Sequence, residues 1–127
     1  MHENEISYAV IESAIKIHKH FGPGLLESVY KNCLHYELLS RNFLVGKEVG
    51  LPVYYNDVRM ECGFRIDLLV ENKVIIEIKS VEELNDIHLA QVLTYLKLSD
   101  CRLGLLLNFN VTRMKNGIRR IVNNLIE

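Results

Sequence analysis

The sequence contains no tryptophan, only two prolines and only three cysteines, and its charges nearly cancel. The cysteines are Cys33, Cys62 and Cys101, an odd number without metal-type spacing, which argues against a disulfide framework or a zinc site. We expect them to be reduced core residues of a cytoplasmic protein. A net charge of −1 is unlike that of a dedicated non-specific DNA-binding protein.

Long apolar runs are also absent. No stretch approaches the roughly 18 uncharged apolar residues of a membrane helix, and the N-terminal MHENEISYAV lacks the basic and then apolar segments of a signal peptide. We therefore expect neither a membrane span nor a signal peptide. The 127 residues, 49% of them hydrophobic, suit a single domain with one core over residues 1–127.

The chain does contain a stretch of regular alternation from Val58 to Ser80. In its first half every second residue is apolar: Val58, Met60, Cys62, Phe64, Ile66, Leu68 and Val70. Residues 73–79 alternate in the same way, so the two halves predict a β-hairpin with one buried face. Asp67, Glu77 and Lys79 all fall outside the apolar pattern.

The length of the hairpin loop decides whether these three side chains meet. A three-residue loop at 71–73 would place Asp67 opposite Glu77 on the same face, whereas a two-residue loop would place Asp67 opposite Ile76. We predict the longer loop, with Asn72 or Lys73 in the left-handed conformation.

Two carboxylates about 5 Å apart repel each other by a few kcal/mol, so Lys79, a shared proton or a divalent cation must offset the repulsion. Carboxylate oxygens suit Mg²⁺ or Mn²⁺, and the main-chain carbonyl of Ile78 is a candidate third ligand. Lys79 can reach a water or a phosphate oxygen on the same face. The set suits metal-assisted hydrolysis of a phosphodiester. The alternative is a cross-strand salt-bridge cluster on a solvated face, worth less than about 1 kcal/mol.

Helical spacing predicts helices on either side of the hairpin. The first begins at the cap Asn4 and buries Ile6, Val10, Ala14, Ile17 and Phe21. The second runs over residues 25–40 and buries Leu26, Val29, Cys33 and Tyr36. The third begins at Asn85 or Asp86 and ends near Leu98.

The remaining segments predict further strands. Residues 44–55 suit an edge position because they include Pro52. Residues 102–109 are almost continuously apolar, as in a buried strand that a crossover helix makes parallel to its neighbour. The spacing of Ile118, Ile121, Val122, Leu125 and Ile126 favours a final helix over a strand. The pattern predicts an α/β fold with a mixed sheet flanked by helices on both faces.

Two motifs carry a resemblance to a known family. Asp67, followed ten residues later by Glu77-Ile78-Lys79, resembles the PD-(D/E)XK nuclease signature, although Ile66 stands where that signature has Pro. Gly24-Leu25-Leu26-Glu27-Ser28-Val29-Tyr30 resembles the motif of the GxxExxY family within this superfamily. The resemblance covers nearly the whole chain and implies a restriction-endonuclease-like fold with a mixed β-sheet.

The resemblance implies a nuclease that uses Mg²⁺ or Mn²⁺ and acts on nucleic acid, with DNA the expected substrate. Asp67, Glu77 and Ile78 would then hold the metal, with Glu27 assisting from the second helix, and Lys79 would position or help deprotonate the attacking water. Glu27 has a plainer alternative, as a first-turn acid stabilised by the helix N-terminus and paired with Lys31.

The resemblance also concerns residues outside the metal site. Gln91 and Tyr95 are similar to the QxxxY element of RecB-like nucleases, in which Gln91 would orient water or phosphate. The alternative for this pair is a polar helix surface. Gly24 would supply backbone freedom, and Tyr30 packing or a hydrogen bond. The alternative function is a nuclease-fold module that binds nucleic acid or a protein with weak or lost catalysis. Such a small domain implies a partner, either a second copy in a homodimer or another protein.

Overall fold

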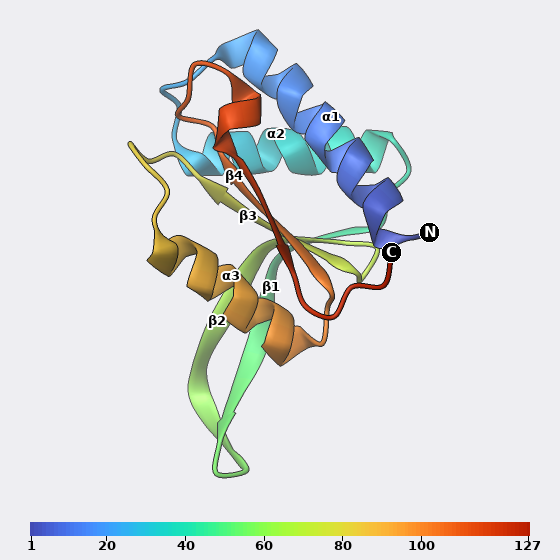
Figure 1. Ribbon diagram of the computed structural model, residues 1–127, viewed down its shortest axis with the longest axis vertical. Coiled ribbons are helices and arrows are strands. Elements are labelled where there is room, and N and C mark those ends of the chain that lie inside the picture. Colours follow the sequence, from blue (N-terminus) through green and yellow to red (C-terminus); the bar gives the residue numbers. More distant parts are fainter.

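The computed structural model describes the backbone of residues 1–127 and every side chain except that of Cys62, so the prediction for Cys62 lies outside the described residues. Its sheet has five strands in the order β1-β2-β3-β4-β5, with helices on both faces (Figure 1). The helices are α1 (Glu3–Phe21), α2 (Glu27–Ser40) and α3 (Asp86–Ser99), and a 3₁₀ turn, η1, spans Met114–Gly117. The strands are β1 (Val45–Tyr55), β2 (Val58–Val70), β3 (Val74–Lys79), β4 (Leu103–Asn108) and β5 (Ile118–Val122). The predicted α/β class is confirmed.

The hairpin between β2 and β3 has the predicted three-residue loop. Val70 pairs with Val74 and Leu68 with Ile76 in an antiparallel register. Asn72 adopts the left-handed conformation with a φ of 55°, and so does Glu71. The register that was predicted to bring Asp67 opposite Glu77 is therefore present.

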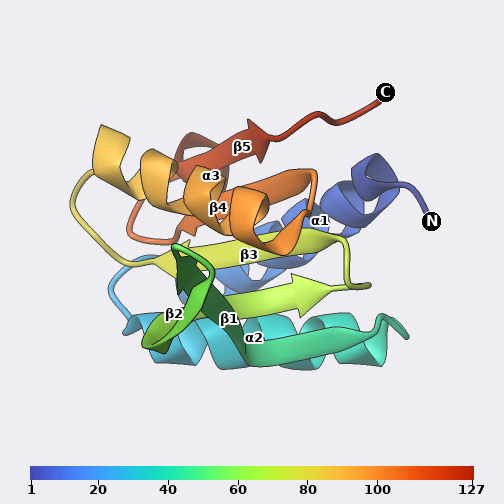
Figure 2. The ribbon, with the colours of Figure 1, turned by 90° about the horizontal axis from the view of Figure 1, so that it is seen from below.

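The sheet separates two cores (Figure 2). Val74, Ile76 and Ile78 of β3 point into the core formed with α1 and α2, while Ile75 points into the core formed with α3. Alternation along β3 therefore places Glu77 and Lys79 on the side of α3. Strand β4 runs parallel to β3, as predicted, and all six of its residues are buried.

The face that α2 buries differs from the prediction. Tyr30, Leu34 and Leu38 are buried, whereas Leu26 and Tyr36, which were predicted to be buried, are 74% and 73% exposed. Val29 is also exposed, and Cys33 is half-buried. The reason is a long-range contact, because Tyr30 stacks on Phe109, the residue that follows β4, with ring centroids 4.4 Å apart. That contact orients α2 so that Tyr30, Leu34 and Leu38 face the sheet, instead of the residues that were predicted to do so.

The final segment is also corrected. Residues 118–122 form β5, an edge strand antiparallel to β4, instead of the predicted helix. Pairing satisfies the backbone groups on the free edge of β4, which a helix would leave unpaired. At the other end of the chain, His2 caps α1 in place of Asn4, and Phe21 is exposed. None of the helices in the described chain is long and apolar enough to cross a membrane.

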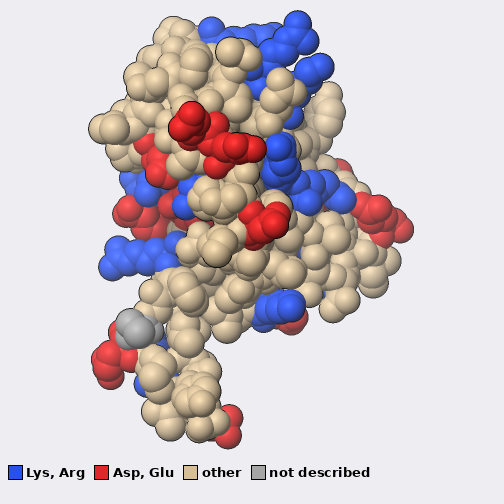
Figure 3. Space-filling model, turned by 60° about the vertical axis from the view of Figure 1, so that its left-hand side comes forward, with Lys and Arg blue, Asp and Glu red and all other residues tan. Residues whose placement is uncertain are grey.

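Strands β1 and β2 continue past the sheet as a two-stranded ribbon, residues 50–65, which we call the arm. It projects from the body of the molecule (Figures 1 and 3). At its base, Leu51 belongs to the α3 core, and the Phe64 ring lies 5.1 Å from the Tyr95 ring. Its far end is a tight turn in which Asn56 and Asp57 have φ values of 51° and 64°.

Candidate active site

Strands β2 and β3 separate beyond the pair Leu68–Ile76, and two carboxylates fill the gap between them. Asp67 Oδ2 accepts a hydrogen bond from the backbone N–H of Ile78 at 2.8 Å. Glu77 Oε1 accepts one from the backbone N–H of Asp67 at 3.0 Å. Each carboxylate thus accepts a hydrogen bond from a backbone N–H of the other strand. We call this place, formed by Asp67, Glu77 and Ile78, the fork.

An irregularity in β1 explains why Asp67 N–H is free to bond to Glu77. The register between β1 and β2 skips the pair Glu48–Asp67, and Glu48 has a φ of 54°. A residue in the left-handed region interrupts the regular ladder. The backbone of β1 therefore does not pair with Asp67, and the N–H of Asp67 bonds to the side chain of Glu77 instead.

The electrostatics of the fork favour a protonated Glu77. Its side chain is almost fully buried, and burial, followed by the charge of Asp67, raises the pKa of Glu77 to about 8, although Lys79 acts in the opposite direction. Burial, followed by the charges of Glu77 and Asp67, raises the pKa of Tyr95 to about 12. The phenol of Tyr95 therefore lies within electrostatic reach of both acids.

Lys31 of α2 is a neighbour of the fork that the sequence did not predict. Its Nζ lies 3.5 Å from Asp67 Oδ1 and 3.2 Å from Glu48 Oε1. Burial alone would lower the pKa of Lys31, but the charge of Asp67 and the hydrogen bond to Glu48 outweigh it and raise the pKa. Among the described side chains, Lys31 forms ion pairs with these two acids. The pair with Glu27, which belonged to the alternative for that residue, is not observed.

Lys79 and Gln91 lie on the α3 side of the sheet. Both are half-buried. Lys79 follows Glu77 by two residues on β3, and Gln91 precedes Tyr95 by one helical turn, on the same side of α3. These two side chains are therefore presented to the region where Tyr95 and Glu77 approach each other.

The Gly24–Tyr30 motif covers the end of the loop before α2 and the first turn of that helix, and hydrogen bonds hold the loop in place. The Tyr30 hydroxyl donates to the Gly22 carbonyl at 2.6 Å and accepts from the Leu25 N–H at 3.2 Å. Gly24 has a φ of 104°, which other residues rarely adopt. The Ser80 hydroxyl donates to the Leu25 carbonyl at 2.8 Å. The loop is thus tied to the end of β3, two residues from the fork.

Glu27, the third motif residue, begins α2 and is exposed. Among the described side chains, no three His, Cys, Asp or Glu residues gather closely enough to hold a metal ion. The structure therefore brings Asp67 and Glu77 together but does not add Glu27 to them. Two motif residues have structural roles in the loop, and Glu27 is the one whose side chain faces solvent.

Asn108 is a second residue that sequence reasoning missed. Its side chain is buried at the end of β4, donates to the Val81 carbonyl at 3.0 Å and accepts from the Val81 N–H at 3.1 Å. It therefore fixes the chain just beyond Lys79. A polar residue inside the apolar run 103–109 was the available signal, because buried amides require partners.

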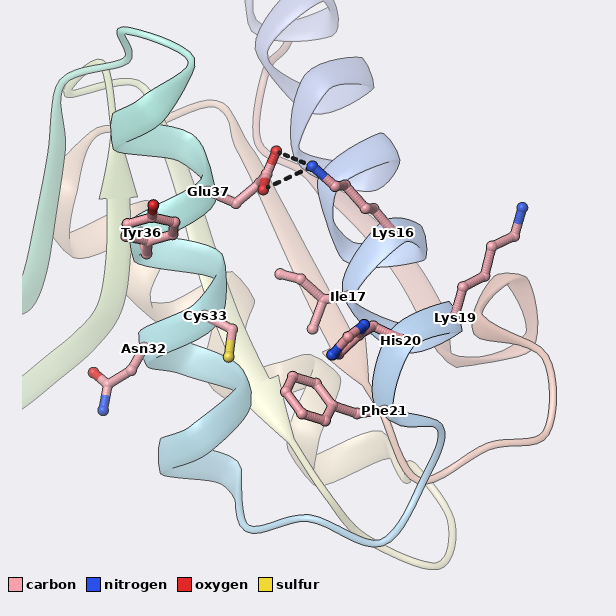
Figure 4. Close-up of a pocket in the computed structure, with 9 residues that line it drawn as sticks. All are labelled: Lys16, Ile17, Lys19, His20, Phe21, Asn32, Cys33, Tyr36 and Glu37. Atoms are coloured by element: carbon pink, nitrogen blue, oxygen red, sulfur yellow. Dashed lines mark hydrogen bonds and ion pairs between the residues drawn. The ribbon is translucent and has the colours of Figure 1, made fainter.

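A hollow of about 670 Å³ lies away from the fork, between α1 and α2 (Figure 4). Its only acid is Glu37, which accepts hydrogen bonds from Lys16 Nζ at 3.2 and 3.3 Å and from Arg41 Nε at 3.0 Å. Both oxygens of Glu37 are therefore occupied. We place the candidate chemistry at the fork, where, among the described side chains, Asp67 has one ion-pair partner and Glu77 has none.

Comparisons with known proteins identify a family and a similar structure. The family model of the PD-(D/E)XK nuclease superfamily matches residues 4–121. The crystal structure of SSO0001 is similar, with a TM-score of 0.47 and 21% sequence identity, over 98% of this chain and 63% of that chain. The chain thus spans less than two thirds of the length of that structure. No curated protein sequence matches this chain.

Proposed function

Because this chain belongs to the PD-(D/E)XK nuclease superfamily, we propose that it is a nuclease dependent on Mg²⁺ or Mn²⁺ and that DNA is its substrate. The observation that carries the proposal is the fork, where two acids from different strands meet. The narrower assignment to the GxxExxY family is part of the same proposal and rests on Gly24, Glu27 and Tyr30.

The donor set of the fork fits a hard divalent cation. Asp67 and Glu77 provide carboxylate oxygens, which Mg²⁺ and Mn²⁺ prefer. In a strand, the N–H and C=O of one residue point to the same edge, and the N–H of Ile78 points to Asp67. The Ile78 carbonyl therefore opens toward the fork and would be the third protein ligand, with Glu27 assisting from α2.

A bound cation would polarise the scissile phosphate and stabilise its developing charge. Lys79, next to Glu77 on the same face, would position the attacking water or help to deprotonate it and would stabilise charge on the phosphate. Gln91, one turn before Tyr95, would orient the water or a phosphate oxygen. The side chains of Lys79 and Gln91 supply donors for these tasks.

The test is cleavage of single-stranded, duplex, branched and RNA substrates with Mg²⁺ or Mn²⁺, beside Glu77→Ala purified identically. The proposal requires activity that disappears in EDTA and in Glu77→Ala. Activity that survives the substitution is a contaminant and contradicts the proposal.

The second candidate is a module that binds nucleic acid or a protein partner with weak or lost catalysis. It is favoured by the pKa of about 8 for Glu77, because a protonated acid is a poor metal ligand at neutral pH. Light scattering, with and without nucleic acid, tests whether a second copy of the chain is the partner. Stable binding of nucleic acid without cleavage under any metal condition would favour this candidate.

A further inference from the structure

The arm carries a hollow of about 280 Å³ that the proposed chemistry does not use. We call it the arm trough. Its lining combines two arginines and one acid with glycine and apolar residues: Gly50, Leu51, Pro52, Arg59, Met60, Glu61, Gly63, Phe64 and Arg65. The trough lies on the two-stranded ribbon that projects beyond the body of the molecule (Figure 3).

The register of the ribbon places four of the lining residues on one face. Gly50 pairs with Arg65, and Pro52 pairs with Gly63. Directly opposed residues share a face of a strand pair. Leu51 and Phe64 occupy the alternate positions, pack toward α3 and also line the trough. The trough therefore begins at the base of the arm, beside α3.

The floor of the trough is kept open by glycine. A Cβ at Gly63 would collide with the backbone carbonyl of Leu51, so the fold itself requires Gly63. Gly50 has no such requirement, because a Cβ there would meet nothing within 4 Å and its φ is not positive. Glycine weakens a strand and is typical of sites where a ligand approaches the backbone. Gly50 thus indicates a surface left free for a ligand.

The charge of the trough suits an anion. Arg59 and Arg65 are exposed, and within the described part of the chain neither takes part in an ion pair. Glu61 is the single acid in the lining. Guanidinium groups bind phosphate with paired hydrogen bonds. Because Arg65 precedes Asp67 by two residues on β2, the trough leads toward the fork.

An aromatic residue lies at the far end of this face. Tyr54 pairs with Arg59 and is 58% exposed. A basic groove followed by an exposed aromatic ring is the arrangement with which proteins hold single-stranded nucleic acid.

We propose that the arm trough binds the phosphate backbone of one nucleic-acid strand and directs it to the fork. This inference rests on the proposed nuclease function and adds its substrate class, which is a single strand or an unpaired end. Arg59 and Arg65 contact phosphates, Gly50 lets the backbone approach, and Tyr54 stacks on a base.

The test is the fluorescence anisotropy of a fluorescein-labelled oligo-dT in EDTA, titrated at several salt concentrations. Arg59→Gln combined with Arg65→Gln should weaken binding on the order of tenfold. It should also reduce the slope of log K against log salt by about 0.7 for each lost phosphate contact. Arg113→Gln is the control, because Arg113 is an exposed arginine next to η1, on the body of the molecule.

Gly50→Val tests the shape of the trough without changing its charge. Valine favours strands, so the melting temperature should not fall, whereas oligo-dT binding should weaken on the order of tenfold because the floor is filled. Glu61→Gln should have the opposite effect and tighten oligo-dT binding, because it removes the only acid among the residues that line the trough. Wild-type affinity in both Gly50→Val and the double arginine variant would overturn the inference.

Other outcomes separate this inference from the nuclease proposal. If wild type fails to bind oligo-dT at low salt, or if arm variants change the oligomeric mass but not the binding, the trough is not a nucleic-acid site. If arm variants bind normally while Glu77→Ala loses cleavage, the trough inference is wrong and the nuclease proposal is supported. If binding depends on the trough but wild type cleaves nothing, the trough inference is supported and the nuclease proposal is wrong.

Discussion

Glu37 on α2 and Glu77 on β3 are both shielded from solvent, but their surroundings are opposite. The side chain of Glu37 is 15% exposed and lies between two cations, Lys16 and Arg41. The hydrogen bond from Arg41 is the main cause that lowers the pKa of Glu37. Glu77 has the acid Asp67 as its neighbour, and burial raises its pKa to about 8.

This difference in neighbours means that ionised Glu37 stabilises the fold, whereas ionised Glu77 destabilises it. Glu37 is compensated by its partners, as acids in structural ion pairs are. An acid whose pKa is strongly raised by burial and a like charge is typical of a functional site. The salt-bridge alternative for the fork required Lys79 to pair with the acids, but the ion pair that the described side chains form there comes from Lys31.

The largest expected effect is on cleavage. Glu77→Gln keeps the shape of the side chain but removes a metal-binding oxygen, so the single-turnover rate with Mn²⁺ should fall on the order of a hundredfold or more. Glu37→Gln, the matched change at the other glutamate, should leave the rate unchanged. An equal loss of rate in a folded Glu37→Gln protein would remove the distinction between the two acids.

Metal affinity should show the next largest effect, through its dependence on pH. A cation must displace the proton of Glu77, so below about pH 8 the apparent affinity for Mn²⁺ should rise by about tenfold per pH unit. Calorimetry in buffers of different ionisation enthalpy should detect the released proton. Glu37→Gln should retain this dependence, and an affinity independent of pH would contradict the assignment of Glu77 as a ligand.

The fork was predictable from sequence because its causes are local. The regular alternation determined which residues of β2 and β3 share a face, and the three residues between Val70 and Val74 determined the register. Counting back from that loop predicted that Asp67 and Glu77 meet. The buried parallel strand β4 was predictable for the same reason, since an apolar run needs two covered faces.

The wrong predictions depended on contacts between distant residues. Two apolar stripes of α2 were available, and the stacking of Tyr30 on Phe109 selected one of them. Lys31 reaches Asp67 only because α2 packs across the sheet. Residues 118–122 are apolar at spacings that suit a helix, but the unpaired edge of β4 makes them a strand.

Stability should respond to pH in opposite directions at the two glutamates. The pKa of Glu77 is raised, so its contribution is fully present below about pH 4.5 and is lost as pH rises through about 8. The pKa of Glu37 is lowered, so its contribution is present above about pH 4.5 and is lost only as pH falls further. Glu77 therefore lowers the stability as the pH rises, and Glu37 lowers it as the pH falls below about 4.5.

Urea unfolding of the metal-free protein at several pH values measures this contrast. Between about pH 5 and pH 8, the free energy of unfolding of wild type should fall relative to Glu77→Gln, by at most about 1.4 kcal/mol per pH unit. The difference between wild type and Glu37→Gln should stay constant over the same range. Parallel curves for wild type and Glu77→Gln would mean that Glu77 is ionised in the folded protein throughout.

The smallest expected effect comes from the cation beside each acid. Lys31→Gln removes the partner of Asp67 and Lys16→Gln removes a partner of Glu37, and each should cost less than about 1 kcal/mol because both ion pairs are partly solvated. Only Lys31→Gln should change Mn²⁺ affinity, tightening it by a few-fold, because a positive charge next to a ligand opposes a second cation. Unfolding in urea and Mn²⁺ titration measure the two quantities separately. If Lys31→Gln left the Mn²⁺ affinity unchanged, as Lys16→Gln should, Asp67 would not be a metal ligand. Burial alone would then distinguish Glu77 from Glu37.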